Sequence, residues 1–251
     1  MVSKRDDVDL LYNRSKTMTA VCKYLFWGNS VISLAAAICS GQIKVVLTYV
    51  QIIGAVLYVV FKSVDDGLFW YNAEMARRKN GIQVAFNVSL AELETEGYYN
   101  NGLSPSIAKY ALNAFESNFY STFIAGKMLV KGALKALVSV VALIVTGWLV
   151  SNGDVLLIIA QAVFSAYVIE DAVMLAIYKL KMDKLYDEAY SAFVTIGVKD
   201  EKQKAWLLSY AVEYEAVKAH YKVRLDSTVF NKHNDELSNK WDIIQQKIVV
   251  Q

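Results

Sequence analysis

The chain has 251 residues, of which 55% are hydrophobic and 20% charged, and its formal net charge is +2. Soluble domains are usually about 45–50% apolar and about 25% charged, so this composition favours a membrane protein. The small net charge argues against a protein that coats nucleic acid through a strongly basic surface. The charges are also unevenly placed, because Lys23 and Lys44 are the only charged residues between Met18 and Phe61.

Four apolar runs predict transmembrane helices, because each is close to the ~20 residues that cross a ~30 Å hydrocarbon core. They cover residues 21–39, 45–61, 128–150 and 155–177. Very short connections, at residues 41–44 and 151–154, join the first run to the second and the third to the fourth. The sequence therefore predicts an all-α membrane protein with two transmembrane hairpins.

Lysines and arginines cluster in the N-terminal, middle and C-terminal segments, whereas the two hairpin tips contribute only Lys44. By the positive-inside rule, both termini and the middle segment are expected in the cytoplasm. Four regions follow from this topology: an N-terminal segment with the first hairpin (1–62), a cytoplasmic insert (63–127), the second hairpin (128–178) and a cytoplasmic C-terminal helical region (179–251).

The cytoplasmic insert is expected to begin with a helical continuation of the second span, over residues 65–79, that stops at Asn80-Gly81. The next stretch, residues 82–90, has a β-like or irregular pattern and allows a small β element in the insert. A serine and a proline at Ser104-Pro105 predict the start of a helix that runs into the third span.

The C-terminal region is expected to be helical throughout. The fourth helix should extend to Gly197, and Asp200 with Gln203 resembles a capping box that starts the next helix. That helix carries a seam with coiled-coil-like spacing, and an amphipathic segment follows at residues 237–248. These features predict a helical stalk or bundle, packed against copies of the same chain. The seam consists of Leu207, Tyr210, Tyr214, Val217 and Tyr221.

Four charged residues lie close to the predicted membrane boundary. Lys131 and Lys135 sit one turn apart at the start of the third span, and Glu170 and Asp171 lie at the matching end of the fourth. The lysines are expected to extend toward the headgroups, or alternatively to line a cavity or pair with the two acids. In an oligomer, a ring of Glu170 or Asp171 side chains would attract cations.

Enzyme motifs are missing from the sequence, which has no HExxH zinc motif, no P-loop and no GxSxG elbow. We therefore expect no catalytic residues, no bound metal and no cofactor. A transporter would show internal repeats and broken helices. Three classes remain open. They are an oligomeric channel with a cytoplasmic sensing domain, a membrane scaffold that recruits a protein partner, and a small membrane enzyme or transporter, which the missing motifs and repeats disfavour.

Three short stretches carry a family resemblance: Phe86 to Leu90 after the first hairpin, Asn113 to Met128 before the third span, and Leu225 to Phe230 followed by Trp241. In these stretches and in its layout the chain resembles the SMODS-associated four-transmembrane effectors of bacterial antiphage defence. It departs from that pattern at His233, where an arginine is expected.

The resemblance implies a homo-oligomeric effector in the bacterial inner membrane, acting as an ion channel or membrane disruptor. A partner nucleotidyltransferase would supply its signal, a cyclic or short linear oligonucleotide. The expected phosphate-binding side chains are Arg77, Arg78, Lys79, Lys222 and Arg224. For the first three, the alternative is a basic anchor on the cytoplasmic side of the membrane.

Overall fold

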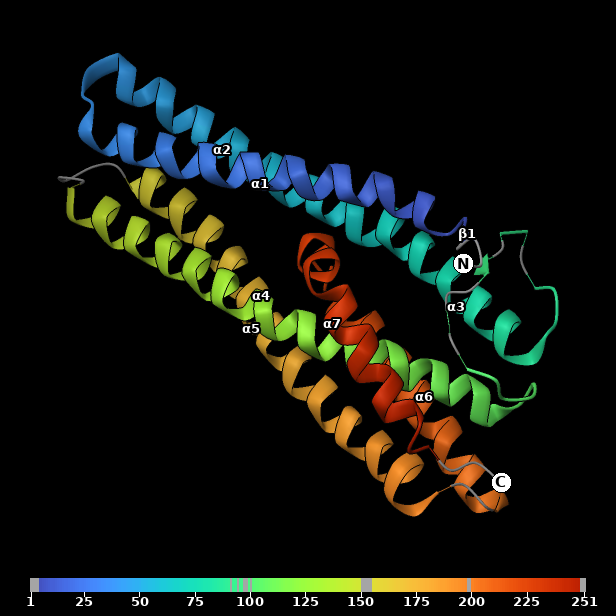
Figure 1. The fold of residues 1–251 in the computed structure, drawn as a ribbon. Coiled ribbons are helices and arrows are strands. Elements are labelled where there is room, and N and C mark those ends of the chain that lie inside the picture. The colour runs from blue at the N-terminus through green and yellow to red at the C-terminus, as the bar shows by residue number, and fades with distance from the viewer. Residues whose placement is uncertain are drawn as a thin grey trace. The chain divides into compact units, whose positions relative to one another are not determined.

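The computed structural model describes residues 5–90, 92–93, 95–96, 99, 101–149, 155–197 and 200–248. Nearly all of these residues are helical (Figure 1). In chain order the elements are β1 (Arg5–Asp6), α1 (Asp9–Ile38), α2 (Gly41–Val64), the π-helical turn η1 (Asp65–Phe69), α3 (Trp70–Phe86), β2 (Thr95–Glu96), α4 (Ile107–Leu149), α5 (Val155–Tyr190), the π-helical turn η2 (Ser191–Ile196), α6 (Glu201–Tyr221) and α7 (Ser227–Gln245).

Two compact units make up the fold. Unit 1 comprises Met1–Leu10, Ala73–Leu129 and Met174–Gln251, and unit 2 comprises Leu11–Asn72 and Val130–Val173. Helices α4 and α5 are long enough to contribute residues to both units.

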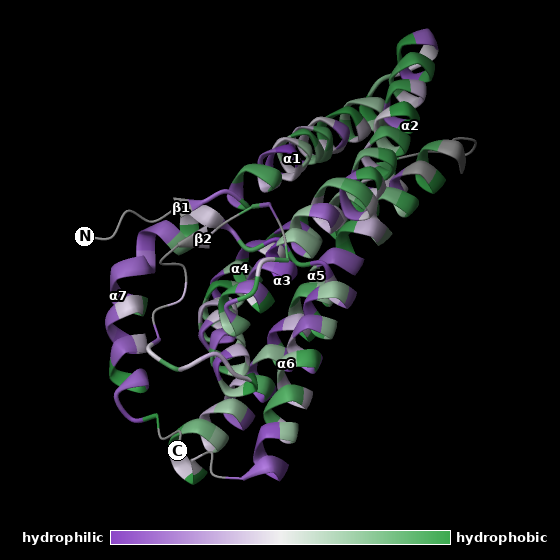
Figure 2. Cartoon of the chain, turned by 90° about the vertical axis from the view of Figure 1, so that its right-hand side faces the viewer, coloured by the Kyte–Doolittle hydropathy of each residue, from purple (hydrophilic) through white to green (hydrophobic). Residues whose placement is uncertain are grey.

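Four helices are long and apolar enough to cross a membrane, as the composition predicts. They are Asp9–Ile38, Gly41–Phe86, Ile107–Leu149 and Leu157–Ile196. Hydrophobic residues predominate along α2, whereas α7 is largely hydrophilic (Figure 2). The chain is therefore a multi-pass helical membrane protein. Only two residues separate α1 from α2, and Gly41 has a φ of 64° there, which favours glycine. The predicted connection at 151–154 lies outside the described residues.

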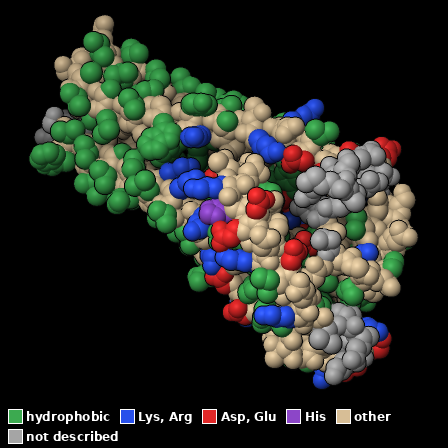
Figure 3. Space-filling view, viewed as in Figure 1, with side chains coloured by type: hydrophobic (Ala, Val, Ile, Leu, Met, Phe, Trp, Pro, Cys, Tyr) green, Lys and Arg blue, Asp and Glu red, His purple; other side chains and the backbone are tan. Residues whose placement is uncertain are grey.

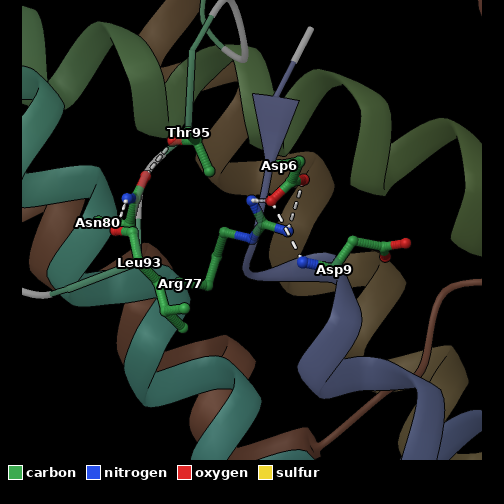
Figure 4. Close-up of polar contacts among 6 residues, drawn as sticks. All are labelled: Asp6, Asp9, Arg77, Asn80, Leu93 and Thr95. Atoms are coloured by element: carbon green, nitrogen blue, oxygen red, sulfur yellow. Dashed lines mark hydrogen bonds and ion pairs between the residues drawn. The ribbon is translucent and has the colours of Figure 1, made fainter.

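The helix after the second span is longer than the sequence predicts. It does not stop at Asn80-Gly81 but continues to Phe86, and the left-handed residue beyond its end is Asn87, with a φ of 53°. The reason is tertiary: the Asn80 amide donates to the carbonyl of Leu93 at 3.0 Å, and its oxygen accepts from the Thr95 hydroxyl (Figure 4). Asn80 therefore fixes the following loop instead of ending the helix.

A two-residue antiparallel pairing holds this loop to the N-terminal segment, with Arg5 opposite Glu96 and Asp6 opposite Thr95. The predicted irregular stretch 82–90 is thus helical as far as Phe86 and lies outside this pairing.

Helix boundaries in the C-terminal region follow local capping chemistry. Asp200 and Gln203 form the predicted capping box, with the Gln203 backbone amide donating to the Asp200 carboxylate at 2.8 Å. Asp226 accepts from the Thr228 backbone amide at 2.9 Å, so α7 begins well before the predicted segment at 237–248. The fourth helix ends at Gly197, as predicted.

The core of unit 1 is aromatic and is built from α4, α5, α6 and α7. Trp241 packs edge-on against Phe115 at 5.2 Å, and Phe115 stacks on Phe193 at 5.8 Å. The predicted seam of α6 faces this same core. Its side chains therefore pack within their own chain.

Candidate functional site

The outward surface of unit 2 is apolar. Large aliphatic side chains on α2 and α4 are more than half exposed, among them Val46, Ile53, Leu134 and Ile144. Hydrophobic side chains also cover much of the space-filling surface formed by these helices (Figure 3). A soluble helical unit would bury such residues, so this surface is suited to hydrocarbon.

The interior of unit 2 contains a polar layer, which reverses the pattern of a soluble protein. Among the described residues of its helices, seven polar side chains are each at most 2% exposed. Polar groups inside a membrane protein are costly and commonly mark a functional path. This set, the polar core, consists of Asn29, Ser33, Gln51, Ser139, Thr146, Gln161 and Ser165.

A hydrogen-bonded chain joins three of the spanning helices. The Gln51 amide of α2 donates to the Gln161 oxygen of α5 at 3.0 Å, and the Gln161 amide donates to the Ser165 hydroxyl at 3.4 Å. Ser165 in turn donates to the backbone carbonyl of Ser139 in α4 at 3.2 Å. Gln51 is ten residues beyond the start of α2, about 15 Å along the helix and thus near mid-membrane.

Asn29 of α1 belongs to this layer but has no hydrogen-bond partner among the residues that the structure describes. Both the oxygen and the nitrogen of its carboxamide are buried. A Cβ atom on Gly54 would lie 2.8 Å from Asn29 Oδ1, so any larger residue here would displace the Asn29 side chain. An unpaired buried amide typically costs about 1–3 kcal/mol.

Next to the polar core is an aromatic layer. Phe164 stacks on Phe26 with ring centroids 5.6 Å apart and meets Tyr58 edge-on at 5.3 Å. Ala55 and Val168 complete this cluster, which is buried. The layer packs residues of α1, α2 and α5 against one another.

Beyond the aromatic layer, Asp171 forms an ion pair with Lys62 of α2 and accepts a hydrogen bond from the Tyr58 hydroxyl at 3.4 Å. Of the predicted boundary charges, Asp171 thus pairs with Lys62 of the second span. Those two lysines and Glu170 are exposed.

In unit 1, the two arginines that the sequence predicts to bind phosphate form ion pairs with acidic side chains of the same chain. Arg77 makes two bonds to the Asp6 carboxylate, at 3.0 and 2.9 Å (Figure 4). Arg78 of α3 binds the Glu215 carboxylate of α6 at 2.7 Å and the Glu215 carbonyl at 3.2 Å. Both arginines therefore join separate segments within the unit.

Of the three other predicted residues, Lys79 follows Arg78 on α3, and the other two lie at the end of α6. Lys79 and Lys222 are exposed, and Lys222 ends α6 in a left-handed conformation with a φ of 50°. Arg224 is half-buried and donates to the Lys222 carbonyl at 3.3 Å. The structure thus brings Arg77 and Arg78 together on α3, and Lys222 and Arg224 together at the end of α6.

Two features escaped the sequence reasoning. One is the largely buried ion pair between Lys218 of α6 and Glu74 of α3, at 2.9 Å. The other is the polar core, although the sequence carries a signal for it. Asn29 with Ser33, and likewise Gln161 with Ser165, are polar pairs four residues apart, which places each pair on one face of its helix.

Among the described residues, no group of three or more His, Cys, Asp or Glu side chains is arranged to hold a metal ion. The site is therefore defined by neutral amides and hydroxyls inside a bundle with an apolar exterior. Such groups can solvate a permeating ion or water, or hold helices together.

The fold and this site define a multi-pass helical membrane protein with a polar interior. Comparisons with family models, with curated proteins and with solved structures found no match.

Proposed function

We propose that this chain is a homo-oligomeric effector of the bacterial inner membrane that conducts ions, or otherwise permeabilises the membrane, when a nucleotide signal acts on unit 1. The observation that carries the proposal is the polar core of unit 2. Its hydrogen-bonded amides lie near mid-membrane, where polar groups are costly unless they serve conduction or helix association. The antiphage role and the nucleotide signal rest on the family resemblance.

The orientation of the proposed effector follows from its charges. Unit 1 contains Arg77, Arg78 and Lys79, together with the lysines that follow the fourth span. The positive-inside rule favours a cytoplasmic position for such segments, with both termini on that side. A signal made in the cytoplasm then has direct access to unit 1.

Control of permeation requires a closed and an open state. The aromatic layer of Phe26, Tyr58 and Phe164 is fully packed and suits a closed hydrophobic gate. A ligand opens or closes such a gate only by binding one state more tightly than the other. The ion pairs of Arg77 and Arg78 are suitable switch elements, because phosphate can compete with carboxylate for both guanidinium groups.

The experiment that tests the proposal measures ion flux through liposomes containing the purified protein, with and without cyclic and linear oligonucleotides. Gln51→Leu and Gln161→Leu remove polar groups from the core. Losing one hydrogen bond to a permeating ion should raise the free-energy barrier to permeation by about 1.5–3 kcal/mol. The ion flux should therefore fall roughly 10- to 100-fold. Gln42→Leu is the matched control, because Gln42 is exposed on the same helix as Gln51.

A second variant tests the gate. Phe164→Ala opens the aromatic layer and should raise the flux measured without any nucleotide. If correctly inserted protein shows no flux with any nucleotide, and Phe164→Ala is equally silent, the channel proposal fails. The chain would then be better described as a non-conducting scaffold whose cytoplasmic helices recruit a protein partner.

A further inference from the structure

A groove of about 430 Å³ lies in unit 1 between α4, α5 and α7. Its volume falls within the range of small-ligand sites. None of the basic residues predicted from the sequence to bind phosphate lines it. Its lining consists of Phe119, Thr122, Phe123, Gly126, Lys127, Lys179, Tyr186, Leu237 and Lys240.

Three helices each bring one lysine to the groove. Lys127 comes from α4, Lys179 from α5 and Lys240 from α7. Figure 3 shows several lysine and arginine side chains on this face of the molecule, with acidic side chains among them. Lysines converging from separate helices can contact several oxygens of one phosphate-bearing ligand.

The lysines are held in place by acidic or aromatic neighbours. Lys179 pairs with Asp183, which also accepts from the Thr122 hydroxyl at 3.1 Å. Lys127 lies 5.3 Å from the ring centre of Phe123. A Cβ atom on Gly126 would lie 3.0 Å from Lys179 Cε, so glycine leaves room for that lysine to lie against α4.

The third lysine, Lys240, contacts Glu236 at 2.6 Å, and Glu236 contacts His233 at 3.2 Å. Lys240 and His233 lower the pKa of the Glu236 carboxyl, which therefore stays ionised at neutral pH. The three lysines that line the groove are thus opposed by two neighbouring acids, Asp183 and Glu236, which leaves one positive charge in excess.

Aromatic rings form the other part of the lining. Phe119 and Tyr186 lie with ring centres 6.2 Å apart, and His233 meets Phe123 edge-on at 5.1 Å. Rings beside lysines form a combination that holds nucleotides, because bases stack on aromatic side chains while cations contact the phosphates. A lipid headgroup would use the lysines but would have no need of the rings.

We infer that this groove binds a nucleotide, with its phosphate at Lys127, Lys179 and Lys240 and its base against Phe123 or Phe119. The inference rests on the proposed function for its ligand class, and it adds the groove as a binding site to the arginine ion pairs proposed above as switch elements. Because α7 forms one wall, an occupied groove holds α7 against α4 and α5 and favours that arrangement of unit 1.

The test measures binding of fluorescently labelled cyclic diadenylate and linear diadenylate to the detergent-purified full chain. Lys179→Met and Lys240→Met should each weaken binding roughly 10-fold, and Phe123→Leu, which keeps an apolar side chain, should do the same. Lys202→Met is the matched control, because it removes the same charge from an exposed site on α6 and should leave binding unchanged.

A second arm separates nucleotide from lipid. The same variants are assayed for association with phosphatidylglycerol vesicles. Nucleotide binding that is lost in the groove variants and kept in Lys202→Met supports the inference. Binding unaffected by the groove variants, or a groove that responds to phosphatidylglycerol alone, overturns it. Binding is measured independently of ion flux, so a protein that fails to conduct leaves the binding result intact. If the protein conducts but the groove variants bind nucleotide as the wild type does, the groove inference alone is refuted.

Discussion

Trp241 should be the main anchor of α7 in unit 1. Its side chain is 2% exposed and contacts the rings of Phe115 at 5.2 Å and Phe119 at 5.7 Å. A buried tryptophan removes up to about 250 Å² from water, and truncation to alanine in a core costs about 3–5 kcal/mol. At about 2–4 °C per kcal/mol for a chain of this length, Trp241→Ala should lower the Tm by roughly 6–20 °C.

The measurement is thermal unfolding in detergent, followed by circular dichroism, with limited proteolysis to detect release of α7. Trp241→Phe keeps the ring contacts and removes an indole N–H that is buried without a hydrogen-bond partner among the described residues. We therefore expect it to lose less than about 2 kcal/mol. Trp206→Ala is the control, because Trp206 is 41% exposed on α6. A Tm within about 2 °C of wild type for Trp241→Ala, or a larger loss for Trp206→Ala, would refute the reasoning.

Three further predictions follow from other contacts. Gly54→Ala should destabilise unit 2 by about 1–3 kcal/mol through its clash with Asn29, and Asn29→Ala should relieve this loss in the double variant, measured by thermal unfolding. A double-mutant cycle on Arg78 and Glu215 should give a coupling of about 1 kcal/mol; a coupling near zero would show that this pair does not join α3 to α6. Burial raises the pKa of the Tyr210 phenol, so the unfolded state loses this proton at a lower pH than the folded state does. The free energy of unfolding should therefore be retained below about pH 10 and fall as the pH rises further. Tyr210→Phe should reduce this alkaline decline, measured as Tm against pH.

Local chemistry explains what the sequence predicts well. The spans follow from apolar runs of sufficient length, and the capping box at Asp200 follows from two side chains three residues apart. The predicted helix end at Asn80-Gly81 is wrong because a distant loop takes up the Asn80 side chain, a contact that no local pattern reveals.

The candidate site shows the same limit. The sequence marks Arg77 and Arg78 as a basic cluster, but only the folded chain brings Asp6 and Glu215 to them. Likewise, Gln51 and Gln161 are isolated amides in their apolar runs, and packing of the helices makes them partners at 3.0 Å.

By itself, the sequence determined four segments that are long and apolar enough to cross a membrane as helices, because hydrocarbon imposes a length and an apolar composition on every span. Only the tertiary structure decided which face of each span is buried and which charges neutralise one another. Those outcomes depend on residues more than a hundred positions apart in the chain, such as Gln51 with Gln161 or Arg78 with Glu215. The polar interior of unit 2 and the lysine-lined groove of unit 1 both arise in this way.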